Sequence, residues 1–296
     1  MPYIEITLEL SANFAQGCTE QMENLGALAV SYFDAKDEPV LEPKPGETPL
    51  WDHIKVVGLF SEDCDPQMLS EALKKSFPTH KLSIASLPDQ EWTRTWLEHF
   101  QPILFGRRLW VVPLETDLST LNAEIDAVFL KLDPGLAFGT GTHPTTALCL
   151  QWLEANPPKN KTVMDYGCGS GILAIAALLL GAKKVFAIDY DPQALISTAD
   201  NLQKNNLDPA KCAMLLPEQL PSPAPKVQLI LANILAEPLI ELAPALAKSC
   251  EINGKIILSG LLTSQIEMVK SAYSEWFDFD EATIQDDWVL LCATRK

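Results

Sequence analysis

The strongest chemical signal in the sequence is a glycine-rich run at residues 163–171, Val-Met-Asp-Tyr-Gly-Cys-Gly-Ser-Gly, which leads directly into an apolar segment. A strand that ends in such a run and turns into a helix lets the backbone approach a ligand closely and aims free helix N–H groups at it. Asp189 ends the next β-prone stretch, 22 residues after Gly167, where a carboxylate can accept hydrogen bonds from ribose hydroxyls. These residues predict a nucleoside-binding site.

The spacing of the glycines narrows the choice of nucleoside. A dinucleotide fingerprint has a third glycine or alanine five positions after the first, and that position here is Ile172. No Gly-Lys-Ser/Thr follows, which excludes a P-loop nucleotide triphosphatase. Asp165-x-Gly-x-Gly-x-Gly, with Asp189 after the second strand, resembles the S-adenosyl-L-methionine site of class I methyltransferases. We expect Gly167, Gly169 and Asp189 to bind this cofactor; a nicotinamide-dependent oxidoreductase is the alternative that the spacing opposes.

A second glycine-containing segment, residues 133–146, precedes a helical pattern. It is typical of a mobile loop that ends in a helix cap at Thr142 or His143. Thr145 and Thr146 then lie at the helix start, where hydroxyl and N–H groups can receive a ligand carboxylate. For His143 a capping role is favoured over that of a catalytic base.

Asn233 follows the apolar strand expected at 228–232, beside the point where the strand order of an open α/β sheet reverses. It could simply cap a turn. Methyltransferases that act on planar amides or adenine amino groups resemble one another in an Asn-Pro-Pro-aromatic motif at this place, whereas this chain has Asn-Ile-Leu-Ala. A flexible aliphatic amine is therefore the better substrate, and Asn233 is the candidate catalytic residue, holding the amine in line for transfer.

The elements that must position these residues alternate between strand and helix. Strands are expected at 162–165, 184–189, 228–232 and 255–259, helices at 172–180, 192–205, 238–247 and 263–276, and a terminal antiparallel hairpin at 282–284 and 288–294. This alternation predicts a doubly wound, mostly parallel α/β sheet. Together with the resemblance of the glycine loop, which covers the final hairpin too, it implies the Rossmann-like class I methyltransferase fold. Asp191 before Pro192 is explained by helix capping and is left out of the site.

The first part of the chain has a different order. Strands at 3–10, 27–33, 53–60 and 81–87 with helices at 19–25 and 65–77 give β-α-β-β-α-β, the ferredoxin-like pattern. A proline-rich loop is expected at 38–49, and aromatic residues at spacing four predict a linker helix. We therefore expect a ferredoxin-like domain at 1–88, a linker helix at 89–101 and a methyltransferase domain at 102–296.

The charge of the chain restricts its partners. It holds 39 acidic and 22 basic side chains, a net charge of −17. Residues 1–100 hold 17 acidic and 7 basic side chains, or −10, and the other 196 residues hold −7. Such a surface repels phosphate backbones, which disfavours direct nucleic-acid binding, and attracts a basic protein. The alternative is that the acidity only keeps the protein soluble.

Composition predicts a soluble cytoplasmic protein. The longest near-continuous apolar stretch, 172–182, is far shorter than the roughly 20 residues of a membrane helix. No signal peptide is visible. The seven cysteines form no Cys-x-x-Cys pair, which fits reduced thiols and no metal site. A monomer is the default expectation.

Three motifs together resemble one family over essentially the whole chain: residues 132–146, the loop 165–171 and the run Ala-Asn-Ile-Leu-Ala at 232–236. They are similar to the bacterial PrmA family of ribosomal-protein methyltransferases, which modify the eleventh protein of the large subunit. The resemblance implies an N-terminal substrate-recognition domain on a swinging linker, and trimethylation of lysine ε-amines and the N-terminal α-amine of that basic protein. It also implies cofactor contacts at Thr146, Gly167, Asp189 and Asn233. A methyltransferase of the same fold acting on another protein and a non-catalytic ribosome-binding module are the alternatives.

Overall fold

The computed structural model describes residues 3–36, 49–87, 101–132 and 143–296. The chain divides into two compact units, Met1–Trp96 and Leu97–Lys296, each with its own hydrophobic core. The linker helix expected at 89–101 lies outside the described residues except for Gln101, and so does the expected loop at 38–49 except for Pro49.

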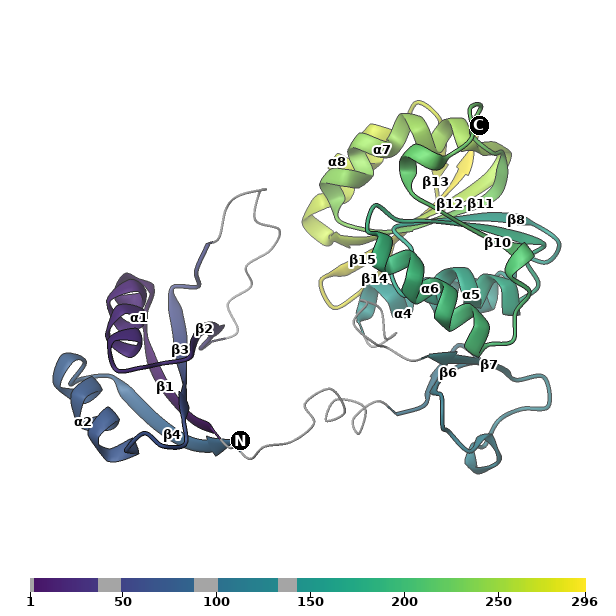
Figure 1. Cartoon of the computed structure of the whole chain (residues 1–296). Helices are drawn as coiled ribbons and strands as arrows, with labels where there is room; N and C mark the ends of the chain where they lie inside the picture. The colour runs from purple at the N-terminus through teal and green to yellow at the C-terminus, as the bar shows by residue number, and fades with distance from the viewer. Residues whose placement is uncertain (1–2, 37–48, 88–100, 133–142) are drawn as a thin grey trace. The chain divides into compact units, whose positions relative to one another are not determined.

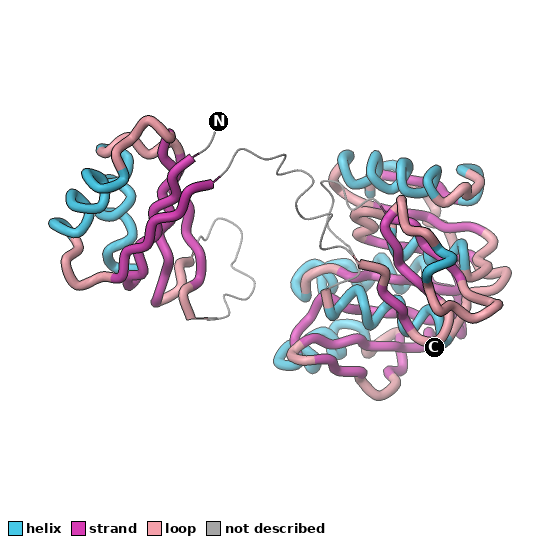
Figure 2. The backbone as a smooth tube through the Cα atoms, turned by 90° about the horizontal axis from the view of Figure 1, so that it is seen from below, coloured by secondary structure: helices cyan, strands magenta, loops and turns pink. Residues whose placement is uncertain are grey.

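The N-terminal unit is a four-stranded antiparallel sheet in the order β2-β3-β1-β4. Its elements follow one another as β1 (Tyr3–Ser11), α1 (Ala15–Asn24), β2 (Ala29–Asp34), β3 (His53–Ser61), α2 (Pro66–Ser76) and β4 (Lys81–Leu87). Figure 2 shows both helices on one face of this sheet. Every second residue of β1 is buried because alternate strand side chains point to the same face. The element order is the β-α-β-β-α-β order that the sequence predicts, and the Asp65 carboxylate caps α2 as expected.

The C-terminal unit is built on an eight-stranded sheet whose main path runs β10-β9-β8-β11-β12-β15-β13, with β14 paired to β15. The neighbours from β10 to β12 are parallel, and β15 is antiparallel to β12. The strands are β8 (Thr162–Tyr166), β9 (Lys184–Ile188), β10 (Cys212–Leu215), β11 (Val227–Asn233), β12 (Cys250–Leu262), β13 (Phe277–Phe279), β14 (Thr283–Gln285) and β15 (Trp288–Arg295).

Helices cover both faces of this sheet. Figure 1 shows α4, α5 and α6 on one face and α7 and α8 on the other. Their bounds are α4 (Pro144–Ala155), α5 (Ile172–Leu179), α6 (Pro192–Lys204), α7 (Ala236–Ser249) and α8 (Ile266–Tyr273). The mostly parallel sheet with its terminal antiparallel hairpin confirms the doubly wound α/β fold predicted for this unit.

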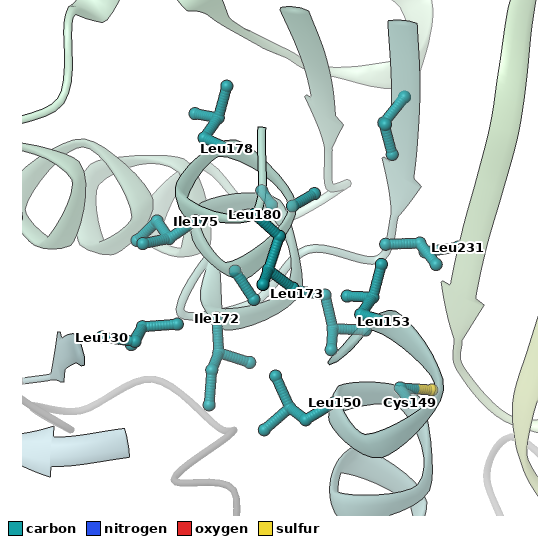
Figure 3. Close-up of a cluster of buried hydrophobic side chains, with 14 of the residues drawn as sticks. Leu130, Cys149, Leu150, Leu153, Ile172, Leu173, Ile175, Leu178, Leu180 and Leu231 are labelled. Atoms are coloured by element: carbon teal, nitrogen blue, oxygen red, sulfur yellow. The ribbon is translucent and has the colours of Figure 1, made fainter. Parts of the chain in front are cut away.

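Helix α5, which follows the glycine loop directly, is buried in a hydrophobic core cluster. All residues of α5 from Ile172 to Leu178 are buried, so this helix is apolar on every side. Figure 3 shows its side chains packed with Leu150 and Leu153 of α4 and with Leu231 of β11. The helix that follows the loop is therefore enclosed by protein along its length, and the loop ends on a fixed support.

A small sheet in the order β5-β6-β7 closes the far side of this cluster. Its strands are β5 (Ile103–Phe105), β6 (Leu109–Pro113) and β7 (Val128–Leu132). Arg108 Nε lies 3.3 Å from Glu154 Oε1, an ion pair that ties this sheet to α4. This sheet was not predicted from the sequence.

Short elements account for most of the remaining differences. Strands β10 and β13 have four and three residues, too few to show a periodicity that distinguishes them from a loop. The helix expected at 263–276 begins as a 3-10 turn at Thr263–Gln265 and is α-helical only over α8. Within the described ranges, no helix has the length and apolar character needed to cross a membrane.

Candidate active site

Three of the predicted site residues lie at one edge of the large sheet. In the parallel pairing, Tyr166 of β8 is level with Ile188 of β9 and with Ala232 of β11. The next residue after each of these strand positions is Gly167, Asp189 or Asn233. The chain runs outward from β8 through β9 to β10 and then returns to β11 on the other side of β8. The switch point therefore lies between β8 and β11, where open α/β sheets bind their ligands.

The loop after β8 has a backbone that only glycine adopts readily. Gly167, Gly169 and Gly171 have φ values of +79°, +53° and +79°, in the left-handed region that disfavours residues with a Cβ. The N–H groups of Gly167 and Cys168 both donate to the Ile188 carbonyl, at 2.8 and 3.0 Å. A Cβ on Gly167 would collide with the Ile234 side chain. The loop therefore bends tightly against β9 and the turn after β11.

Two polar side chains of α6 hold this loop from behind. Thr198 Oγ1 donates to the Gly169 carbonyl, and Asn201 Nδ2 donates to the Ser170 carbonyl, each at 3.0 Å. Both side chains are buried, so these bonds are shielded from competing water. Neither residue was predicted from the sequence. The signal that could have identified them is that both polar side chains fall on the face of α6 that also carries the buried Ala194 and Leu202. Asp191 caps α6 through Gln193, as predicted.

The Asp189 carboxylate accepts two backbone hydrogen bonds, and one of them comes from Gly169 of the glycine loop. Its Oδ2 accepts from Gly169 N at 2.9 Å and its Oδ1 accepts from Asp191 N at 3.1 Å. Asp189 is 7% exposed. Each carboxylate oxygen can accept more than one hydrogen bond, so the group can support the loop and still accept from a ligand hydroxyl.

A second carboxylate, that of Asp165, lies at the end of β8. Its Oδ2 accepts from Ala174 N at 2.9 Å, whereas its Oδ1 is buried with no hydrogen-bond partner among the residues that the structure describes. Burial raises the pKa of this carboxyl to about 7, because removal from water disfavours the charged form. The two carboxylates of the site thus have opposite surroundings: Asp189 is held by two N–H groups, and Asp165 is desolvated.

On the other side of the switch point, Asn233 meets Thr146. Asn233 Nδ2 lies 3.2 Å from Thr146 Oγ1, which joins the end of β11 to the first turn of α4. Thr146 is buried. With its amide nitrogen directed at Thr146, the Asn233 side chain keeps its carbonyl oxygen as an acceptor. The structure therefore brings together two predicted site residues that are 87 positions apart.

His143 caps α4 rather than standing free as a base. Its Nδ1 accepts from Thr145 N at 3.4 Å and lies 2.8 Å from Thr145 Oγ1. Its ring packs edge-on against Trp288, with 4.7 Å between centroids, and burial lowers its pKa. This confirms the capping role favoured from the sequence. The preceding loop at 133–142 lies outside the described residues.

These surroundings fit S-adenosylmethionine. The Asp189 carboxylate retains accepting capacity beside the glycine loop, and Asp165 Oδ1 is a buried acceptor at the end of the same strand that leads into the loop. Among the described residues, no group of three or more histidine, cysteine, aspartate or glutamate side chains could hold a metal ion. The doubly wound sheet and the glycine loop at its switch point define the class of S-adenosylmethionine-dependent methyltransferases.

Comparison with known proteins gives the family. A family model described as "Ribosomal protein L11 methyltransferase (PrmA)" matches residues 2–296. A protein of that name from Pseudomonas putida is 43% identical over 300 residues, covering 100% of both chains. Another, from Idiomarina loihiensis, is 45% identical over 298 residues, covering 100% of this chain and 99% of the relative. The chain belongs to the ribosomal protein L11 methyltransferase family, and its methyl donor is S-adenosylmethionine.

A solved structure agrees with this assignment. The crystal structure of ribosomal protein L11 methylase from Lactobacillus delbrueckii subsp. bulgaricus is 36% identical in sequence, with a TM-score of 0.60. The match covers 66% of this chain and 99% of that one. The roles of Thr146, Gly167, Gly169, Asp189 and Asn233 in binding remain predictions that rest on their geometry.

Proposed function

We propose that this protein transfers methyl groups from S-adenosylmethionine to ribosomal protein L11, on lysine ε-amines and on the N-terminal α-amine, up to trimethylation. Two relatives that are 43% and 45% identical to this chain, and that align with it over 99–100% of their length, are named ribosomal protein L11 methyltransferase. The observation that carries the mechanism is the Asn233–Thr146 hydrogen bond at 3.2 Å, at the sheet edge that also holds the glycine loop.

The bound cofactor supplies an electrophilic methyl group. Around it, the glycine loop from Gly167 to Gly171 and the Asp189 carboxylate form one wall, and Thr146 and Asn233 form the other. Because the amide of Asn233 neither gains nor loses a proton near neutral pH, its task is to orient the amine through its carbonyl oxygen.

The attacking nitrogen needs a free lone pair. A model lysine has a pKa of about 10.4, so at pH 7 roughly one in two thousand is neutral. Burial of the amine next to Asn233 favours the neutral form, and the proton leaves to solvent. Catalysis by this chain is then mainly positioning, with no dedicated base assigned.

We assign recognition of the protein substrate to the N-terminal unit at 1–88, which we take to be ferredoxin-like, connected by the segment 89–101 to the catalytic domain at 102–296. The net charge of −10 over residues 1–100 suits a basic protein partner. We further propose that the protein acts as a cytoplasmic monomer and does not bind nucleic acid directly.

The deciding experiment is intact-mass spectrometry of purified, unmethylated L11 after incubation with this protein and S-adenosylmethionine. We expect mass gains in methyl steps, ending at three methyl groups on each modified amine. The variant Asp189→Ala should remove the gains, since it loses the carboxylate of the cofactor wall. If cofactor binds and L11 gains no mass, the substrate is another protein.

A second experiment tests the role of Asn233. For Asn233→Ala we expect the turnover number to fall by about 100-fold while the dissociation constant of S-adenosylmethionine rises by less than about 10-fold, because orienting groups act most strongly on the transfer step. Equal losses in turnover and in cofactor affinity would leave Asn233 only a cofactor contact.

A further inference from the structure

Strand β12 carries a bulge where it passes the candidate site. In its antiparallel pairing with β15, Leu258 is level with Leu291, and Leu261 is level with Val289. Two residues of β12, Ser259 and Gly260, therefore lie opposite one residue of β15, Leu290. Bulges bend a strand locally and redirect its side chains, and they are frequent beside active sites.

The first bulge residue contacts the start of α4. The Ser259 hydroxyl lies 3.3 Å from the Thr145 carbonyl oxygen and 3.0 Å from the Val289 carbonyl oxygen. Ser259 is fully buried. Its hydroxyl thus ties the first turn of α4, where Thr146 follows Thr145, to the sheet.

The second bulge residue contacts the turn after β11. Gly260 has a φ of +84°, and a Cβ there would collide with the Ile234 carbonyl oxygen and lie 2.8 and 3.0 Å from Ile234 C and N. The backbone directly after Asn233 therefore rests against Gly260. In the parallel pairing of β11 with β12, Asn233 itself is level with Ser259.

We propose that the Ser259–Gly260 bulge sets Asn233 and Thr146 at the separation that methyl transfer requires. Ser259 acts through the Thr145–Thr146 turn, and Gly260 acts through the Asn233–Ile234 peptide, so both are positioning residues that touch no substrate. The inference rests on the proposed function of Asn233. It adds a pair of residues, remote in sequence from every motif of the site, on which the geometry of that site depends.

The test compares Gly260→Ala and Gly260→Asn with Gly254→Ala. Gly254 lies in the same strand, and a Cβ there would be 2.8 Å from both Cys250 Sγ and the Glu251 carbonyl oxygen, so its replacement strains β12 at the other end. Asparagine tolerates positive φ better than alanine but keeps the Cβ that meets Ile234. We expect both Gly260 variants to lower turnover at least 20-fold at saturating S-adenosylmethionine, and Gly254→Ala to lower the unfolding temperature with turnover within twofold of the parent.

Recovery of turnover in Gly260→Asn would overturn the inference, because backbone strain rather than contact with Ile234 would then be the cause. A loss of turnover in Gly254→Ala equal to that in Gly260→Ala would also overturn it, since general strain in β12 would suffice.

A double-mutant cycle separates positioning through Asn233 from a merely structural role. In the Asn233→Ala background, Gly260→Ala should cost less than twofold more, because the group through which it acts is gone. Multiplying losses would refute the inference while leaving the proposed function intact. If the parent does not methylate L11, the same double-mutant cycle uses another readout, the dissociation constant of S-adenosylmethionine measured by calorimetry. If Asn233→Ala changes neither quantity, the role of Asn233 and this inference both fall.

Ser259→Ala provides a test that needs no change of backbone. It removes only the hydroxyl, and we expect turnover to fall about fivefold, with no further loss when it is combined with Thr146→Val. An unchanged turnover in Ser259→Ala would show that the α4 half of the inference is wrong. This variant also serves if Gly260→Ala does not fold.

Discussion

The two strands that flank the switch point, β8 and β11, build their ends of the site differently. After β8 the site is made of backbone: N–H and carbonyl groups of a glycine loop, held by Asp189, Thr198 and Asn201. After β11 it is made of side chains, the Asn233 amide against the Thr146 hydroxyl. We call the glycine loop with Asp189 the backbone wall and the Asn233–Thr146 pair the side-chain wall. The backbone wall fits a role in holding the cofactor, and the side-chain wall fits a role in orienting the amine during transfer. We therefore expect substitutions in the backbone wall to weaken cofactor affinity and substitutions in the side-chain wall to lower the turnover number.

The largest effect is expected at Asp189. Asp189→Ala leaves the N–H groups of Gly169 and Asp191 without their carboxylate acceptor. Hydrogen bonds to charged groups contribute about 1.5–3 kcal/mol each, so the dissociation constant of S-adenosylmethionine, measured by calorimetry, should rise by about 100-fold. Asp191→Ala is the matched control: it removes a helix cap worth about 1 kcal/mol and should change this constant by less than about threefold. Similar losses in the two variants would remove the distinction between cofactor contact and cap.

The next effect belongs to the side-chain wall. Thr146→Val keeps the shape of the side chain and removes the oxygen that meets Asn233 Nδ2. We expect the turnover number to fall by about 10-fold, because the Asn233 amide loses its orientation, while cofactor affinity changes by less than about threefold. Steady-state kinetics with L11 at saturating cofactor, set beside calorimetry, gives both quantities. A loss confined to cofactor affinity would mean that Thr146 binds the cofactor and does not orient Asn233.

A reciprocal result is expected for Thr198→Val. This substitution removes the hydroxyl that donates to the Gly169 carbonyl at 3.0 Å. The glycine loop should become less well held, and the dissociation constant of S-adenosylmethionine should rise by about fivefold, about the value of one neutral hydrogen bond. Turnover at saturating cofactor should fall by a smaller factor than affinity. Thr198→Ser, which keeps the hydroxyl, should recover most of the affinity; a serine variant as weak as the valine variant would point to lost packing.

The smallest effect is one of stability and concerns Asp165. Burial raises its folded-state pKa to about 7, whereas an unfolded aspartate has a pKa of about 3.9. The folded state therefore binds the extra proton between about pH 4 and pH 7, and stability from this group is lost as the pH rises through that window. The Asp165→Asn side chain stays neutral at every pH. The difference in unfolding temperature between this variant and the parent should therefore grow by a few degrees in favour of the variant as the pH rises to 7, and stay constant above pH 7.

Thermal unfolding without cofactor at pH 5, 6, 7 and 8 measures this difference. A gain that is the same at all four values would mean that Asp165 does not titrate in this range.

The two walls also differ in how far the sequence revealed them. The glycine loop is contiguous, so Gly167, Gly169 and the distance to Asp189 could be recognised as a motif, and the strand and helix alternation around it was predicted well. The supports of that loop, Thr198 and Asn201, were missed because a polar residue inside a helix has many possible partners. The sheet β5-β6-β7 was missed because its strands of three to five residues show no clear period.

The sequence alone determined the local elements, the glycine loop, the caps at Asp65, Asp191 and His143, and the family of the protein, because each depends on residues close together in the chain or on the whole pattern of motifs. Only the tertiary structure decided that Asn233 contacts Thr146 and that the β12 bulge lies against both of their neighbours. Those contacts join residues separated by 26 to 114 positions, and they depend on strand register and on a left-handed glycine that nothing in the local sequence of β12 distinguishes from any other glycine in a strand.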